Sequence, residues 1–95
     1  MRKFSAKEAY EYATYESLGR FELGEPAIAT EAYYSYMYAK ACLKGRFELG
    51  ETAIAKEALL SYWYASRVLK ARFEAGEAVI KDSEYWEDYK SFFKL

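Results

Sequence analysis

Apolar residues in this chain recur at helical spacing, in blocks separated by short segments rich in glycine, arginine and glutamate. Between residues 31 and 44 one set follows the three-to-four-residue spacing of a single helix face: Ala32, Tyr36, Ala39 and Leu43. The block at 57–70 repeats this register with Ala58, Tyr62, Ala65 and Leu69. On nearly the opposite side of the first block lie Tyr34, Tyr38 and Cys42. A helix that is apolar on two sides is expected to pack between two neighbours, so the pattern predicts stacked layers.

The segments between the helical blocks share one motif with a fixed period. Arg-Phe-Glu, followed by a variable residue and Gly-Glu, begins at Arg20, Arg46 and Arg72, which are 26 residues apart. A constant period of roughly 20–50 residues is typical of stacked repeat arrays. The sequence therefore predicts one two-helix unit repeated in register.

Helix start and stop signals set the expected elements. Ser5 and Glu8 form a capping-box pattern, so the first long helix is expected to run from Ser5 to about Leu18. Thr30 is the expected N-cap of the second long helix, and Gly45 its left-handed stop. The third long helix begins near Glu57 and ends by Gly76, and the last begins at Asp82 or Ser83 and ends near Lys94. Short helical turns are expected at 25–29, 52–56 and 78–81.

These elements define the fold class. We expect an all-α, solenoid-like array of alternating long and short helices in a single domain spanning 1–95. The repeats cover about 5–29, 30–55 and 56–81, and 82–95 forms a capping helix. Neither helix of a unit buries enough surface alone, so neighbouring units must stack.

Composition narrows the function classes. The net charge is −1, from 14 basic and 15 acidic residues, which disfavours nucleic acid as a partner and a polybasic membrane anchor. No apolar run approaches the roughly 18 residues needed to cross a membrane. Cys42 is the only cysteine, so no intramolecular disulfide forms, which fits a reducing compartment.

The usual catalytic chemistries are missing. The chain has no histidine, so Ser-His-Asp and Cys-His arrangements are impossible and a zinc site lacks ligands. No phosphate-binding or dinucleotide fingerprint occurs. Each connector does carry a glutamate pair: Glu22 and Glu25, Glu48 and Glu51, and Glu74 and Glu77. We interpret these as helix-start charges and partners for the arginines, and expect no enzyme, no cofactor and no metal site.

One helix face is a candidate contact surface. It carries Tyr33, Met37, Lys40 and Lys44 in the second repeat, and Leu59, Trp63, Ser66 and Lys70 in the third. The corresponding residues of the last helix are Tyr85, Tyr89 and Phe92, whereas the first repeat has Lys7, Glu11 and Thr14. We expect an exposed apolar stripe, with Tyr33, Met37, Leu59, Trp63, Tyr85 and Tyr89 as anchors and Lys40, Lys44 and Lys70 as a rim. Ordinary filling of the groove between helices is the alternative.

The repeated arginines have two interpretations. Arg20, Arg46 and Arg72 each follow a helix end, where they are expected to bond the last carbonyls. In the alternative they form a ladder that binds phosphates, with Phe21, Phe47 and Phe73 stacking on bases. The balanced net charge argues against this second interpretation.

The repeat resembles a known short tandem repeat. The segment 38–55, Tyr-Ala-x-x-x-Leu-Lys-Gly-Arg-Phe-Glu-x-Gly-Glu-x-Ala-Ile-Ala, is similar to repeats of phage and prophage proteins, and the likeness covers roughly residues 9–81. Typical members carry proline where Glu22, Glu48 and Glu74 stand here. The resemblance implies a helical array of phage or prophage origin, with no assigned activity and no catalytic residue.

These observations favour a non-enzymatic, protein-binding module. The specific hypothesis is a phage-encoded inhibitor of a host factor, such as a CRISPR or other defence component, acting like an anti-CRISPR protein in the cytoplasm of a bacterial host. One alternative is a nucleotide or nucleic-acid binder that uses Arg20, Arg46 and Arg72. The other is a structural phage protein that self-associates, with the apolar stripe as a homodimer interface.

Overall fold

The chain forms an all-α structure in which long and short helices alternate. The computed structural model describes residues 4–17 and 19–95, and within those ranges it contains helices and turns but no strand. The predicted all-α class is therefore confirmed. The molecule is elongated, with principal extents of 46 × 20 × 16 Å.

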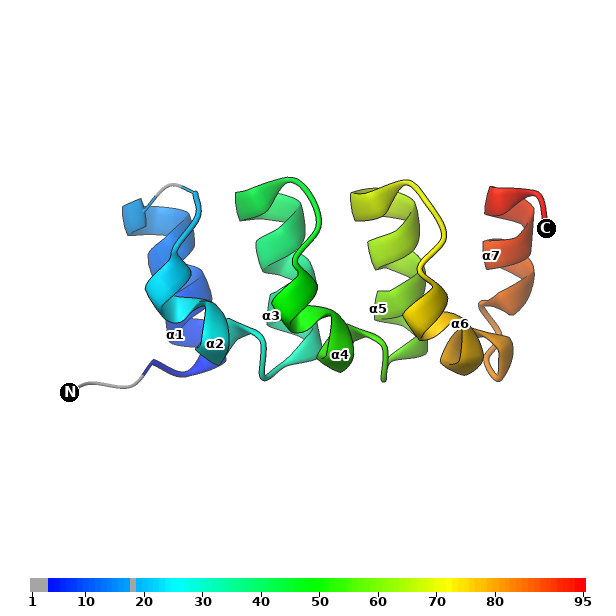
Figure 1. Ribbon diagram of the computed structural model, residues 1–95, viewed down its shortest axis with the longest axis horizontal. Helices are drawn as coiled ribbons and strands as arrows, with labels where there is room; N and C mark the ends of the chain where they lie inside the picture. The colour runs from blue at the N-terminus through cyan, green and yellow to red at the C-terminus, as the bar shows by residue number, and fades with distance from the viewer. Residues whose placement is uncertain (1–3, 18) are drawn as a thin grey trace.

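The long helices stand side by side in one row and point the same way (Figure 1). They are α1 (Ala6–Tyr12) with its extension η1 (Ala13–Ser17), α3 (Ala32–Tyr38) with η3 (Ala39–Leu43), α5 (Ala58–Trp63) with η5 (Tyr64–Leu69), and α7 (Trp86–Phe93). The short elements cross in front of this row: η2 (Glu22–Gly24) with α2 (Glu25–Ile28), η4 (Glu48–Gly50) with α4 (Glu51–Ile54), and α6 (Glu74–Lys81).

The N-caps of the long helices agree with the sequence-based predictions only in part. The capping box is confirmed, because the Glu8 amide donates to the Ser5 hydroxyl at 3.1 Å and the Ser5 amide donates to the Glu8 carboxylate at 3.0 Å. The prediction of Thr30 as the next N-cap is wrong. Glu31 holds that position with extended backbone, and the Thr30 hydroxyl instead donates to the Ala27 carbonyl at 2.7 Å.

The last helix also begins later than expected. Its N-cap is Tyr85 and its first residue is Trp86, so the expectation that Asp82 or Ser83 caps this helix is wrong. The Ser83 hydroxyl donates to the Ile80 carbonyl at 2.7 Å and accepts from the Tyr85 amide at 3.1 Å. Ser83 therefore closes α6 and shapes the turn that precedes α7.

The ends of the long helices differ from the sequence prediction. The left-handed residues are lysines rather than glycines: Lys44 has φ 55°, Lys70 has φ 54° and Lys94 has φ 59°. Before Lys44 and Lys70 the helix widens into a π-turn. The predicted end of the first helix at Leu18 lies outside the described residues.

One extra residue accounts for the π-turns. The interval from Tyr38 to Lys44 is six residues, as it is from Tyr64 to Lys70, whereas Tyr89 to Lys94 is five. The helix with the shorter interval, α7, stays α-helical to Phe93. The i→i+5 bonds of a π-turn take up one residue more per turn than the bonds of an α-helix.

The core runs the whole length of the row. Ile28, Ile54 and Ile80 of the short helices are fully buried, as are Ala13, Ala39 and Ala65 of the long ones. Of the predicted core face, Tyr36 and Ala39 are buried, while Ala32 and Leu43 are only partly covered. Close packing of the two layers depends on glycine, because a Cβ built on Gly50 would lie 2.5 Å from the Ser35 hydroxyl.

Candidate functional site

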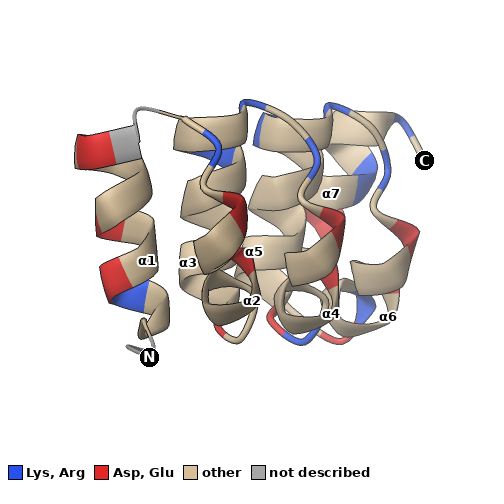
Figure 2. Ribbon diagram, turned by 60° about the vertical axis from the view of Figure 1, so that its left-hand side comes forward, with Lys and Arg blue, Asp and Glu red and all other residues tan. Residues whose placement is uncertain are grey.

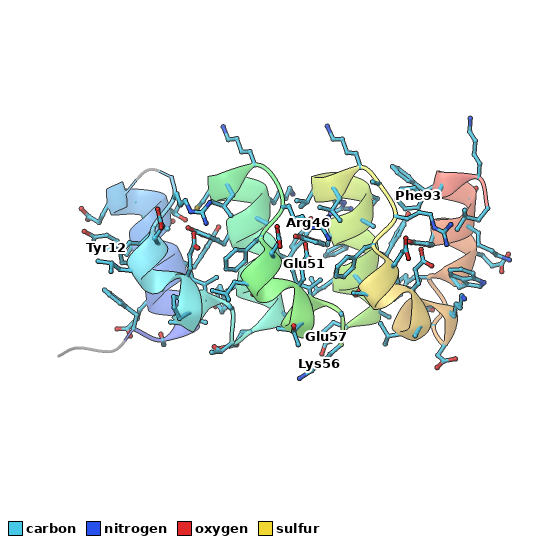
Figure 3. All side chains as sticks on the ribbon, viewed as in Figure 1. Tyr12, Arg46, Glu51, Lys56, Glu57 and Phe93 are labelled. Atoms are coloured by element: carbon cyan, nitrogen blue, oxygen red, sulfur yellow. The ribbon has the colours of Figure 1, made fainter. Side chains whose placement is uncertain are left out.

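The connectors form a repeated polar junction with the next long helix. In the second connector, Arg46 Nε lies 2.7 Å from Glu51 Oε2, and the Tyr64 hydroxyl donates to the same carboxylate at 2.7 Å. The Phe47 amide donates to the Tyr64 hydroxyl at 2.8 Å. Figure 3 shows Arg46 beside Glu51 in front of the row of long helices. One tyrosine thus ties a connector to the helix that follows it.

The other two connectors repeat this geometry with Arg20, Phe21, Glu25 and Tyr38, and with Arg72, Phe73, Glu77 and Tyr89. Each guanidinium bonds the glutamate five residues ahead. For Arg46 and Arg72 the expectation that the arginine caps helix carbonyls is therefore wrong. The second glutamate of each predicted pair is therefore an arginine partner.

The junctions shift the acid–base properties of their members. The Arg72 guanidinium, which donates to both oxygens of Glu77, holds the pKa of that carboxyl below its usual range. Burial, together with the bond to Glu77, raises the pKa of Tyr89 to about 12. The pKa values of Tyr38 and Tyr64 are raised for the same two reasons. All of these shifts favour a carboxylate bonded to a neutral phenol.

The phosphate-ladder arrangement requires accessible phenylalanine rings. Phe47 is 2% exposed and Phe73 is 1% exposed. Each packs edge-on against a junction tyrosine, with ring centroids 5.0 Å apart. Bases cannot stack on these two rings without opening the core. The arginines and phenylalanines of the phosphate-binding alternative are part of the junctions that join the repeats.

The candidate contact face is formed by α3 and α5. Tyr33 is 53% exposed, and Met37, Leu59 and Trp63 are half-buried. The Trp63 ring packs against Tyr36, with centroids 5.9 Å apart, and the Arg67 guanidinium lies 4.4 Å from the Trp63 ring centroid. The expected rim residues Lys40, Lys44 and Lys70 are all exposed.

The expected anchors on the last helix lie elsewhere. Tyr89 is fully buried as the third junction tyrosine. Tyr85 is half-buried and stacks on Tyr62, with ring centroids 6.4 Å apart. The interval from Ile80 to Tyr89 is nine residues, whereas Ile54 to Tyr64 is ten, so the ungapped alignment was wrong by one position.

When the last helix is aligned with the third repeat one residue earlier, the apolar face is flanked by charged residues in both the first repeat and the last helix. Glu84 and Asp88 occupy the last-helix positions that correspond to Leu59 and Trp63, and Lys7 and Glu11 occupy those of the first repeat. The apolar stripe is therefore confined to the second and third repeats, between the first repeat and the last helix.

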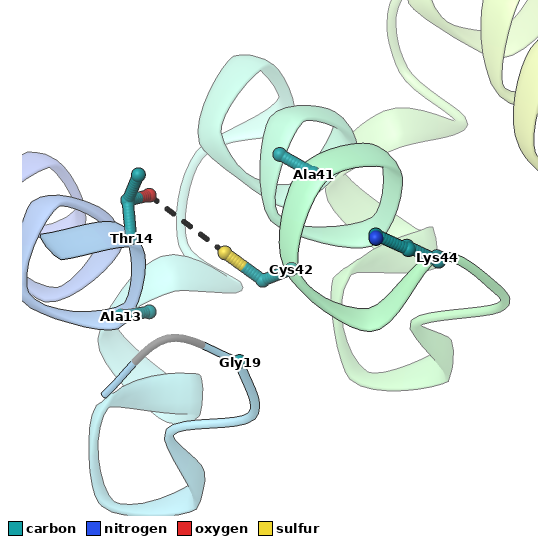
Figure 4. Close-up of a pocket in the computed structure, with 6 residues that line it drawn as sticks. All are labelled: Ala13, Thr14, Gly19, Ala41, Cys42 and Lys44. Carbon is teal, nitrogen blue, oxygen red and sulfur yellow. Dashed lines mark hydrogen bonds between the residues drawn. The ribbon is translucent and has the colours of Figure 1, made fainter. Parts of the chain in front are cut away.

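Grooves lie between the C-terminal ends of two neighbouring pairs of long helices. Between η1 and η3, a cavity of about 340 Å³ is lined by Ala13, Thr14, Gly19, Ala41, Cys42 and Lys44. Figure 4 shows Thr14 and Cys42 facing each other across it, with Thr14 Oγ1 3.7 Å from Cys42 Sγ. This groove carries a single cationic side chain.

The corresponding groove between η3 and η5 is strongly basic. Its cavity of about 180 Å³ is lined by Ala39, Lys40, Lys44, Arg67, Val68 and Lys70. Figure 2 shows Lys and Arg gathered along the edge where the long helices end. Arg67 was not singled out from the sequence, although comparing it with Ala41 in the preceding repeat would have revealed it.

Other kinds of site find no support in the part of the chain that is described. Within it, no cluster of three side chains suited to metal binding occurs, and no helix is long and apolar enough to cross a membrane. No protein-family model matches the chain, and comparisons with curated proteins and with solved structures give no match.

Proposed function

We propose that this chain is a non-enzymatic module that binds another protein on the face of α3 and α5. The contact residues are Tyr33, Met37, Leu59 and Trp63, with Lys40, Lys44 and Lys70 at one end. The observation that carries the proposal is the difference between repeats, because this face is apolar in the second and third repeats and charged at both ends of the row.

Packing of the first repeat against the second does not require apolar residues at the corresponding positions of α1. The first repeat has Lys7 and Glu11 at the places of Tyr33 and Met37, and α1 still packs against α3. An exposed tyrosine beside a half-buried tryptophan and methionine has the composition of an interface core. Exposed apolar groups of this kind usually mark a contact surface.

The charge distribution defines the partner's chemistry. The apolar residues lie on the first half of each long helix, and the cations Lys40, Lys44 and Lys70 lie towards its end. The complementary partner segment has apolar side chains followed by acidic groups. The phage-like repeat motif suggests a host factor as the source of this segment, and a CRISPR or other defence component is the specific hypothesis.

The experiment compares two substitutions at equally exposed apolar positions. Tyr33→Asp adds a carboxylate to the proposed face, and Leu49→Asp adds one to a connector, where the side chains are 53% and 55% exposed. Both proteins are used to capture partners from host lysate, and the captured protein is then purified and its affinity measured. We expect Tyr33→Asp to weaken binding by about tenfold or more and Leu49→Asp to bind like the wild type.

Equal binding by both variants would show that the face of α3 and α5 is not the binding surface. Sizing of the purified chain over a range of concentrations runs in parallel. A dimer that Tyr33→Asp dissociates would assign the same face to self-association instead.

A further inference from the structure

We infer that the groove between η3 and η5 is a binding site for a multiply charged phosphate group. Its four cationic side chains, Lys40, Lys44, Arg67 and Lys70, line one small cavity. The inference goes beyond the proposed function and does not depend on it, because a small inorganic anion is enough to test it.

Comparison of the two grooves isolates what is special about this one. Lys40 stands where the first groove has Thr14, and Arg67 stands where it has Ala41. The backbone setting is the same, since both grooves lie between the π-turned ends of neighbouring long helices. Lys44 itself stands 26 residues after Leu18, so three positions change a groove with one cation into a groove with four.

Helix capping accounts for only part of this charge. Lys44 and Lys70 are the last residues of their helices, where a cation complements the helix dipole. Both hold the left-handed backbone conformation that commonly ends a helix, as Lys94 does at the end of α7. Lys40 and Arg67 stand in the last turns of η3 and η5, where the helix dipole also favours a cation. The dipole does not explain why the cations of two neighbouring helices line one groove.

Protein carboxylates do not neutralise the groove. None of its lining residues is acidic, and none of its four cations takes part in an ion pair between described residues. The Arg67 guanidinium rests on the Trp63 ring, and Lys40 Nζ lies 5.9 Å from the Tyr36 ring centroid. These contacts position the two cations without cancelling their charge. An anion would relieve the repulsion among the four.

The dimensions and donors suit a phosphate group. A volume of about 180 Å³ corresponds to roughly six water molecules at about 30 Å³ each. Lysine ammonium groups bind phosphate as point charges, and an arginine guanidinium can bind two of its oxygens at once. A multiply charged oxyanion gains from all four cations, whereas chloride does not.

The test follows the Arg67 Nε–H and the backbone amides of Lys44 and Lys70 by NMR during titration with inorganic pyrophosphate at constant ionic strength. We expect saturable shifts confined to this groove. Lys40→Thr/Arg67→Ala gives these two positions the residues of the first groove and should weaken binding by about tenfold or more, because two charge-assisted contacts are lost. Lys7→Ala/Lys56→Thr removes the same charge elsewhere and should bind like the wild type.

Substituting the cations of this groove into the first groove provides a second experiment. Thr14→Lys/Ala41→Arg should add a second, weaker site in the groove beside Cys42. Shifts that rise linearly without saturation, or equal affinities for the two charge-removal variants, would overturn the inference. Thermal unfolding of each variant shows whether it is folded, and Lys40→Arg/Arg67→Lys, which keeps both charges, should retain binding.

Discussion

Two tyrosines on α3, separated by one residue, have opposite hydrogen-bonding environments. The Tyr38 hydroxyl donates to the Glu25 carboxylate at 2.6 Å and accepts from the Phe21 amide at 2.8 Å. The Tyr36 hydroxyl is buried and, among the described residues, has no hydrogen-bond partner. Both side chains are almost fully buried, at 0% and 2% exposed.

The same substitution should therefore have different effects at these two sites. Tyr38→Phe leaves a carboxylate and an amide short of a partner, so we expect the free energy of unfolding to fall by about 1–3 kcal/mol. Tyr36→Phe removes a hydroxyl that is already unsatisfied, so we expect no loss, or a gain of up to about 1 kcal/mol. Urea unfolding measures both changes. Equal losses would mean that the junction bonds contribute nothing specific.

The pKa shifts at the third junction predict how stability depends on pH. The folded pKa of Tyr89, about 12, is above the roughly 10 of an unfolded tyrosine, so its contribution is fully present below pH ~10 and is lost as pH rises to about 12. The pKa of Glu77 is lowered, so its contribution is present above an unfolded value of ~4.3 and is lost as pH falls through the folded pKa.

Unfolding measured against pH tests both signs. The stability difference between wild type and Tyr89→Phe should shrink between pH ~10 and ~12, and that between wild type and Glu77→Gln should shrink below pH ~4. Differences that stay constant across these ranges would contradict the proposed junction chemistry.

At the scale of the elements, two glycines have unequal importance. A Cβ on Gly50 would lie 2.5 Å from the Ser35 hydroxyl and 2.7 Å from the Phe47 ring, whereas the nearest atom to a Cβ on Gly45 is 3.9 Å away. The third repeat already carries Ala71 at the place of Gly45. Gly50 therefore permits the close approach of η4 to α3, and Gly45 does not have a comparable role.

We expect Gly50→Ala to destabilise the fold by about 1–3 kcal/mol through overpacking, and Gly45→Ala to change stability by less than about 0.5 kcal/mol. Thermal unfolding of the two variants compares them directly. A loss at Gly45 as large as that at Gly50 would show that the helix end needs the glycine after all.

Much of the element order could be predicted from the sequence. The motif period located the connectors, helical spacing located the long helices, and Ser5 with Glu8 marked the first N-cap. Local signals failed where tertiary contacts decide the outcome, since Thr30 bonds back to α2 and leaves Glu31 to begin α3. Local signals also do not predict the π-turns. The extra residue near the end of each long helix is recognised only when its length is compared with that of the last helix.

The candidate site shows the same limit. Tyr33, Lys40, Lys44 and Lys70 are exposed as expected, because helical spacing alone places them on one face. Tyr89 was assigned to that face because one missing residue before it could not be located from spacing. The partnership of glutamate with arginine was predicted, but the tyrosine that completes each junction lies in the next repeat and gives no local signal.

For the whole molecule, the end faces of the row differ from its inner layers. At the first end, Glu8 and Glu16 take the positions that Tyr34 and Cys42 hold in the second repeat. At the last end, Glu87 and Lys90 take the positions of Tyr62 and Ala65, and Lys90 Nζ lies 3.0 Å from Glu87 Oε2. Polar outer faces of this kind keep repeat arrays from stacking end to end.

Replacing the polar residues of the last end face with those of the inner layers should allow the molecules to stack end to end. We expect Glu87→Tyr/Lys90→Ala to associate in a concentration-dependent way, measured by analytical ultracentrifugation, while Glu84→Ala/Asp88→Ala on the neighbouring face does not. If both double variants behave like the wild type, the polarity of this end face does not control stacking.

Across all scales, positions shared by the repeats make the fold, and positions that differ between them make the proposed binding face. The most direct test gives the second repeat the residues of the first, by Tyr33→Lys/Met37→Glu, and measures the variant's affinity for the captured partner beside its thermal unfolding. We predict binding weakened by about tenfold or more, with a melting temperature within roughly 5 °C of the wild type. Unchanged affinity in the folded variant would contradict the assignment of the α3–α5 face.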